Sequence, residues 1–142
     1  MVNAPIKYKI PISGLKKSTN KIYAGEFWSK RKEFKDSVLS YAVHFCRPVE
    51  KVESYPVEIS YKFFFTSRAL DTLNCAYLAK CFEDALHTLD IIEDDDPKHV
   101  ARSILEVVKI DKKKTKTAVV GLGPAQNAKN EDWLEITIKK YN

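Results

Sequence analysis

The chain has 142 residues, of which 44% are hydrophobic and only ten are Gly or Pro. This composition predicts one globular domain spanning residues 1–142 and excludes a disordered chain, a collagen-like repeat and a multidomain enzyme. No stretch approaches the roughly 18 apolar residues of a membrane span, and the N-terminus lacks the apolar run of a signal peptide. The three cysteines suit free thiols in a reducing compartment. We therefore expect a cytoplasmic protein.

The charges are unevenly distributed along the chain, whose net charge is +5. The segment Cys81–Pro97 holds seven carboxylates and no Lys or Arg, so the remainder carries 24 basic against 12 acidic residues. The surface of such a protein is expected to attract phosphate groups except where this acidic segment lies. A metal-dependent nuclease has this distribution of charge. A basic domain with one solvated acidic loop is the alternative that charge alone leaves open.

The N-terminal half predicts an edge strand and a helix. Ile6–Ile12 alternates apolar and basic residues and contains a proline, which favours a short edge strand. From Gly25 to Cys46, apolar residues recur at spacings of 7, 4, 3 and 4, the pattern of an amphipathic helix. Pro48 ends this helix because proline disfavours helical geometry in the residue before it.

Two further strands and a second helix are predicted after Pro48, with a final strand at the C-terminus. Val57–Phe65 alternates cleanly and indicates a strand, and Asn74 can cap a second helix that runs to about Leu89. Val100–Ile110 is rich in β-branched residues and indicates a strand, although its middle is also compatible with a helix. Trp133–Tyr141 alternates again. The buried stripe predicted for the second helix is Leu78, Phe82, Ala85 and Leu89.

The order β, α, β, α, β, β predicts an α+β fold. We expect a small mixed β-sheet with the two main helices packed on one of its faces.

The residues suited to chemistry lie around the second predicted helix. At about 100° per residue, one polar edge of that helix carries Tyr77, Lys80 and Asp84. Asp71 lies just before the helix, and Asp94 and Asp95 lie just after it. Carboxylates with one lysine could hydrolyse phosphodiesters, since a hard cation such as Mg²⁺ prefers carboxylate oxygens and an ammonium offsets charge in the transition state. The simpler alternative is an i,i+4 surface pair followed by a solvated turn.

The order of these residues resembles a known nuclease family. Asp71-x-x-Asn74, Lys80, Asp84-x-Leu86 and Asp94-Asp95 resemble the D-x-D-N, lysine, D-A-L and D-D motifs of the RusA-like Holliday junction resolvases, the crossover junction endodeoxyribonucleases of bacteria and their phages. IPISG, STNKIYAG and FWSKRKEFKD near the N-terminus, and WLEITI near the C-terminus, are similar to other segments of phage members. The resemblance therefore spans nearly the whole chain.

The resemblance implies an intertwined homodimer, encoded by a bacterium, phage or prophage, that binds four-way DNA junctions. It implies paired symmetric nicks made with Mg²⁺, with Mn²⁺ as a substitute, in DNA recombination and repair. The matching catalytic residues are Asp71, Lys80 and Asp95. Asp71, Asp94 and Asp95 match the metal ligands, with Asn74 or Asp84 as further oxygen donors.

This chain departs from the family pattern at the first motif. Leu73 stands where most members have a second aspartate, and about three residues are added between Asn74 and Lys80. A non-catalytic branched-DNA-binding protein on the same fold, or a nuclease with another structural preference, therefore stays open beside the resolvase. The expected contacts to the DNA backbone are Arg31, Lys32, Lys35, Arg68, Lys112, Lys113 and Lys114.

Overall fold

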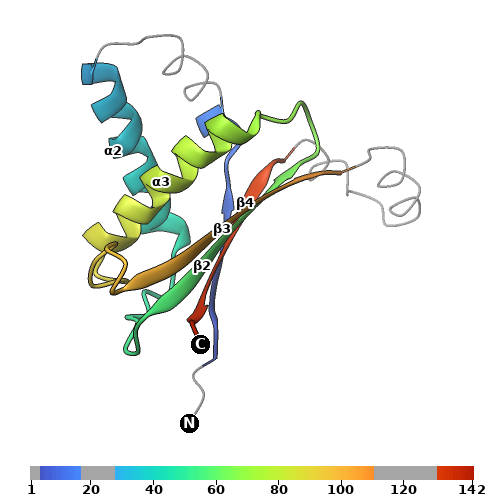
Figure 1. The fold of residues 1–142 in the computed structure, drawn as a ribbon. Helices are drawn as coiled ribbons and strands as arrows, with labels where there is room; N and C mark the ends of the chain where they lie inside the picture. Colours follow the sequence, from blue (N-terminus) through green and yellow to red (C-terminus); the bar gives the residue numbers. More distant parts are fainter. Residues whose placement is uncertain (1–3, 17–27, 111–130) are drawn as a thin grey trace.

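A computed structural model describes residues 4–16, 28–110 and 131–142 (Figure 1). In chain order its elements are β1 (Ile6–Pro11), α2 (Trp28–Phe45), β2 (Val57–Phe65), α3 (Thr72–Thr88), β3 (Val100–Lys109) and β4 (Trp133–Lys140). A single helical turn at residues 13–16 follows β1. Within the described ranges, no helix is long and apolar enough to cross a membrane. The order and positions of the elements confirm the predicted α+β fold with its small mixed sheet.

The four strands form one sheet in the order β1-β4-β2-β3. β4 pairs antiparallel with both β1 and β2, whereas β2 and β3 are parallel. Parallel neighbours need a long crossover connection, and α3 provides it. The two ends of α3 therefore lie near opposite ends of the β2–β3 pair, as Figure 1 shows.

Both long helices cover the same face of the sheet (Figure 1). The core lies between the layers because alternate strand residues and one side of each helix are apolar. Ile59 and Phe63 of β2, Val38 of α2 and Phe82 of α3 are all fully buried. The predicted buried side of β2 is confirmed, as is that of β4.

Two details of the second helix differ from the sequence prediction. Asp71, rather than Asn74, is the N-cap, and Asn74 is a buried residue of the first turn. Tyr77 does not stand on the polar edge. Its ring stacks on Phe34 of α2 at a centroid distance of 5.8 Å and packs against the core. An aromatic ring gains more by filling the space between two helices than by facing water.

A buried carboxylate joins the N-terminal turn to the sheet. Asp132, 1% exposed, accepts hydrogen bonds from the backbone and hydroxyl of Thr66 and Ser67 and forms an ion pair of 3.0 Å with Lys16. Its own backbone N–H donates to Ser13. These contacts connect the segment before β4, the end of β2 and the turn after β1.

Candidate functional site

Lys80 is the centre of a cluster of charges on the outer side of α3. Its Nζ lies 2.8 Å from Asp95 Oδ2 and 3.1 Å from Asp84 Oδ1. Asp84 is one turn farther along the helix, whereas Asp95 comes from the loop that leads into β3. The lysine therefore joins the helix to that loop.

The Lys80–Asp95 pair shifts the protonation of both groups toward the charged forms. The hydrogen bond to Asp95 raises the pKa of Lys80 above its ordinary value, and the same bond lowers the pKa of Asp95. An ammonium held between two carboxylates thus stays charged at neutral pH. Because all three side chains are at least partly exposed, a phosphate in solution can reach them.

A second layer lies beneath this cluster. Glu83, whose side chain is 13% exposed, lies 4.0 Å from Lys80 Nζ and accepts a hydrogen bond of 3.0 Å from the hydroxyl of Tyr61 on β2. Burial raises the pKa of Glu83, and the bond from Tyr61 opposes that rise. Burial and the neighbouring carboxylate raise the pKa of Tyr61 well above 10. This tyrosine is therefore a hydrogen-bond donor that fixes Glu83 against the sheet.

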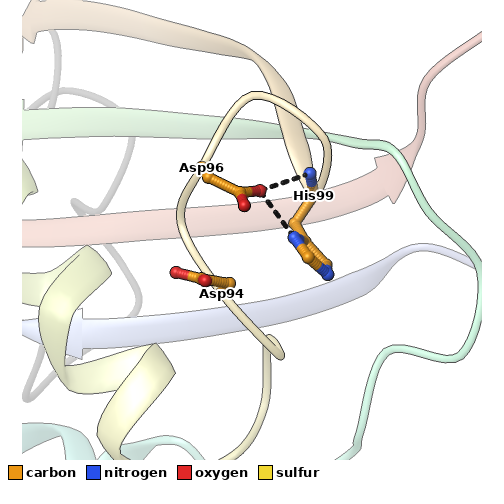
Figure 2. Close-up of side chains that lie close together, drawn as sticks. All are labelled: Asp94, Asp96 and His99. Carbon is orange, nitrogen blue, oxygen red and sulfur yellow. Dashed lines mark hydrogen bonds and ion pairs between the residues drawn. The ribbon is translucent and has the colours of Figure 1, made fainter.

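The loop between α3 and β3 carries a further group of possible metal ligands. One ligand atom each from Asp94, Asp96 and His99 lies within 4.8 Å of the others. Figure 2 shows the carboxylate of Asp96 turned toward His99, whose Nδ1 lies 2.6 Å from Asp96 Oδ1. Asp94 lies on the same loop and accepts a hydrogen bond from the backbone N–H of Asp95. The hydrogen bond between Asp96 and His99 lowers the pKa of Asp96 and raises that of His99.

Asp71 is not brought into this cluster. It precedes Lys80 by nine residues, which corresponds to about 13 Å of helix at roughly 1.5 Å per residue. Both of its carboxylate oxygens accept hydrogen bonds from Asn74, one from the backbone N–H and one from the side-chain amide. Asp71 follows β2 and Asp95 precedes β3, so the crossover places them toward opposite ends of the parallel pair. Within one chain, Asp71 caps a helix.

The predicted DNA contacts fall in three places. Arg31, Lys32 and Lys35 are exposed on the first turns of α2, and Arg68 is exposed in the loop before α3. Lys35 Nζ lies 3.9 Å from Asp84 Oδ2, so the basic side of α2 adjoins the acidic cluster. Lys112, Lys113 and Lys114 lie outside the described residues.

The donor atoms of the loop fit a divalent cation. Carboxylates of Asp94 and Asp96 are hard oxygen donors suited to Mg²⁺ or Mn²⁺, and the imidazole of His99 suits Mn²⁺ or Zn²⁺ better than Mg²⁺. Asp84 and Asp95 are already paired with Lys80. Asp94 and Asp96 are thus the aspartates of this loop that do not pair with Lys80, and Asp96 is hydrogen-bonded to His99 instead.

Sequence reasoning missed Asp96, His99 and Glu83. The spacing Asp94-x-Asp96-x-x-His99 was a usable signal for the first two, since one turn of chain returns the imidazole to the carboxylates. Glu83 had no such signal, because only the packing of α3 on β2 brings it to Tyr61. No protein-family model matches the chain, and no curated protein matches its sequence.

Proposed function

We propose that the protein is a metal-dependent endonuclease that cuts branched DNA, with a four-way junction as the substrate. The observation that carries the proposal is the exposed Lys80 ammonium between Asp84 and Asp95, next to a loop of further carboxylates. The family resemblance of this motif order supplies the substrate class. The proposed enzyme acts in DNA recombination and repair as a homodimer, with Mg²⁺ as its metal and Mn²⁺ as a substitute.

The proposed roles follow from charge and position. Asp94 and Asp96, with the imidazole of His99, would hold the metal, which supplies a Lewis acid for the phosphoryl oxygen and lowers the pKa of a bound water. Lys80 stays protonated and offsets negative charge that develops on the phosphate. Asp95 holds the ammonium in place through the 2.8 Å contact. Lys35, one helix away, adds a cation for the DNA backbone.

A second function from a different class is supported by the position of Asp71. The family pattern expects this carboxylate at the metal, yet both of its oxygens are hydrogen-bonded to Asn74 at the far end of α3. Leu73, at the place of the second motif aspartate, is 72% exposed, and its hydrocarbon side chain offers no ligand atom for a metal. A non-catalytic protein that binds branched DNA through its basic residues is the alternative proposal.

One assay separates these two functions. Purified protein is incubated with a labelled synthetic four-way junction, a flap and a linear duplex, each with Mg²⁺, Mn²⁺ or chelator, and binding is measured in parallel by gel shift. Metal-dependent paired nicks on the junction alone support the resolvase. Nicks on the flap alone indicate a nuclease with another structural preference. Tight binding without product under any metal supports the non-catalytic protein, and neither binding nor cleavage contradicts both proposals.

Asp95→Asn tests the site assignment. This variant keeps the shape of the side chain but removes the charge that holds Lys80, so we expect cleavage to be lost while junction binding persists. Asp90→Asn is the matched control, because it removes one negative charge from the same acidic segment at an exposed turn residue with a φ of 59°. Cleavage by Asp95→Asn at the rate of Asp90→Asn would refute the assignment.

A further inference from the structure

Tyr55 contacts the loop between α3 and β3 at two places. Its hydroxyl accepts a hydrogen bond of 2.7 Å from the backbone N–H of Glu93, the residue before Asp94. Its ring packs edge-on against the imidazole of His99, with 4.8 Å between the ring centroids and 77° between the ring planes. Asp94 and Asp96, the carboxylates assigned to the metal above, lie between these two contacts along the chain (Figure 2). One side chain thus holds both ends of the loop.

The sheet fixes the backbone around Tyr55. This residue lies two positions before β2, and its carbonyl accepts a hydrogen bond of 2.6 Å from Lys140 at the end of β4. Its ring is partly buried against the core. Val57, the first residue of β2, donates a backbone hydrogen bond of 2.8 Å to the carbonyl of His99. The side chain of Tyr55 therefore reaches the loop from a fixed base.

The start of the loop is the part that needs support. The burial of two isoleucines fixes the chain just before Glu93, but Glu93 itself is exposed and the next residue is the first proposed metal ligand. Lys80 holds the loop after Asp94, through its ion pair of 2.8 Å with Asp95. Tyr55 holds the loop before Asp94, through Glu93. The two contacts together restrict where the carboxylate of Asp94 can lie.

We propose that Tyr55 is a positioning residue of the metal loop. Its hydroxyl fixes the position of Asp94 through Glu93, and its ring orients the imidazole of His99. Groups that hold a metal ligand from behind set its orientation, and removing them lowers metal affinity by roughly 10–100-fold. Ligands already in place also reduce the entropy that is lost when the ion binds. The inference rests on the metal site of the proposed function, but both contacts of Tyr55 exist without the metal.

Two substitutions separate the hydroxyl from the ring. Tyr55→Phe keeps the ring and leaves the N–H of Glu93 to water, which can reach this exposed residue. Tyr55→Leu removes both contacts. Tyr8→Phe is the matched control, because the hydroxyl of Tyr8 also accepts a backbone hydrogen bond, from the exposed Glu50, but β1 lies at the edge of the sheet opposite β3. Thermal unfolding by circular dichroism establishes that all variants fold.

Mn²⁺ binding to the full chain measures the effect, with free Mn²⁺ followed by electron paramagnetic resonance. The Kd should rise about tenfold in Tyr55→Phe and about a hundredfold in Tyr55→Leu, and it should stay unchanged in Tyr8→Phe. Paramagnetic broadening of the His99 imidazole resonances in the wild type identifies the loop as the site. In the junction assay, the Mg²⁺ concentration for half-maximal cleavage should rise by the same factors while the rate at saturating Mg²⁺ is retained. A merely structural role would not separate these two quantities.

Two measurements on the metal-free protein test the contacts themselves. Amide hydrogen exchange at Glu93 should be faster in Tyr55→Phe than in the wild type, because the N–H has lost its acceptor. The NMR resonances of the His99 imidazole should move in Tyr55→Leu but not in Tyr55→Phe, since only Tyr55→Leu removes the ring current that acts on them. Unchanged exchange and unchanged resonances would contradict both contacts.

Failure of this inference differs from failure of the proposed function. Equal Mn²⁺ Kd values for the wild type and both Tyr55 variants would overturn the role of Tyr55 and leave the metal site in place. A wild type that does not bind Mn²⁺, or binds it without broadening His99, would overturn both. Mn²⁺ binding that weakens in the Tyr55 variants of a chain that cuts no DNA would support the inference and contradict the nuclease.

Discussion

Replacing Asp132 with asparagine should cost the fold a large part of its stability. The carboxylate is 1% exposed and accepts hydrogen bonds of 2.7–3.3 Å from the backbone and hydroxyl groups of Thr66 and Ser67. Lys16 Nζ donates to the same carboxylate at 3.0 Å and is itself largely buried. In Asp132→Asn, one acceptor oxygen becomes an NH₂ group that faces these donors. Lys16 also loses its counter-charge.

The magnitude follows from the burial of the pair. Removing one partner of a buried ion pair destabilises by about 3–5 kcal/mol, because the other charge remains without compensation. Lys16 keeps some access to water, which favours the lower part of that range. Domains of this size have only about 5–15 kcal/mol of stability in total. With a urea m-value of about 2 kcal/mol per molar, a loss of about 3 kcal/mol lowers the midpoint by about 1.5 M.

Urea unfolding monitored by tryptophan fluorescence measures this effect. Glu131→Gln is the control, since it makes the same chemical change at the neighbouring residue, which is exposed. We expect its free energy of unfolding to stay within about 0.5 kcal/mol of that of the wild type, so that the two urea midpoints nearly coincide. If Asp132→Asn unfolds at the same urea concentration as Glu131→Gln, the carboxylate does not stabilise the junction between the N-terminal turn and the sheet.

The same carboxylate gives the stability a pH dependence. Burial alone would raise the pKa of Asp132, but the hydrogen bonds from Ser67, Lys16 and the backbone lower it below its ordinary value. A depressed pKa in the folded state contributes stability above the unfolded pKa, near 3.9, and that contribution is lost as the pH falls through the folded pKa. The stability difference between wild type and Asp132→Asn should therefore narrow as the pH falls below about 4.

Three further outcomes are expected. Lys80→Gln should slow single-turnover junction cleavage by about 10²–10³-fold with little change in binding, since it removes the ammonium proposed to stabilise the transition state; an unchanged rate would exclude that role. The pKa of His99 measured by NMR should lie above 6.5 and fall in Asp96→Asn, because the carboxylate favours the imidazolium; an identical titration would contradict the contact in Figure 2. Burial raises the thiol pKa of Cys46 and Cys75 to about 12 and that of Cys81 to about 11. A thiol reagent at pH 8 should therefore label these cysteines only after urea unfolding, and rapid labelling of the native protein would refute their burial.

Local patterns were enough to predict the secondary structure. Alternation placed Val57–Phe65 at the bounds that β2 has, and apolar spacing placed α2, because the periodicity of a helix or strand is written in neighbouring residues. The N-cap of α3 was predicted three residues late. Asp71 and Asn74 are both good capping residues, so the sequence does not show which of them is the N-cap. The structure shows that it is Asp71, because its side chain accepts a hydrogen bond from the backbone N–H of Asn74.

The sequence by itself determined the α+β class, the buried stripes and the meeting of Lys80 with Asp84, since one turn of helix separates them. Only the tertiary structure decided that Asp95 joins this pair and that Asp71 does not. The reason is the parallel pairing of β2 and β3, which makes α3 a crossover and sends the loops at its two ends to opposite ends of the sheet. The same pairing leaves β3 at the edge of the sheet. Strand order depends on contacts between residues far apart in the chain, and no local pattern records them.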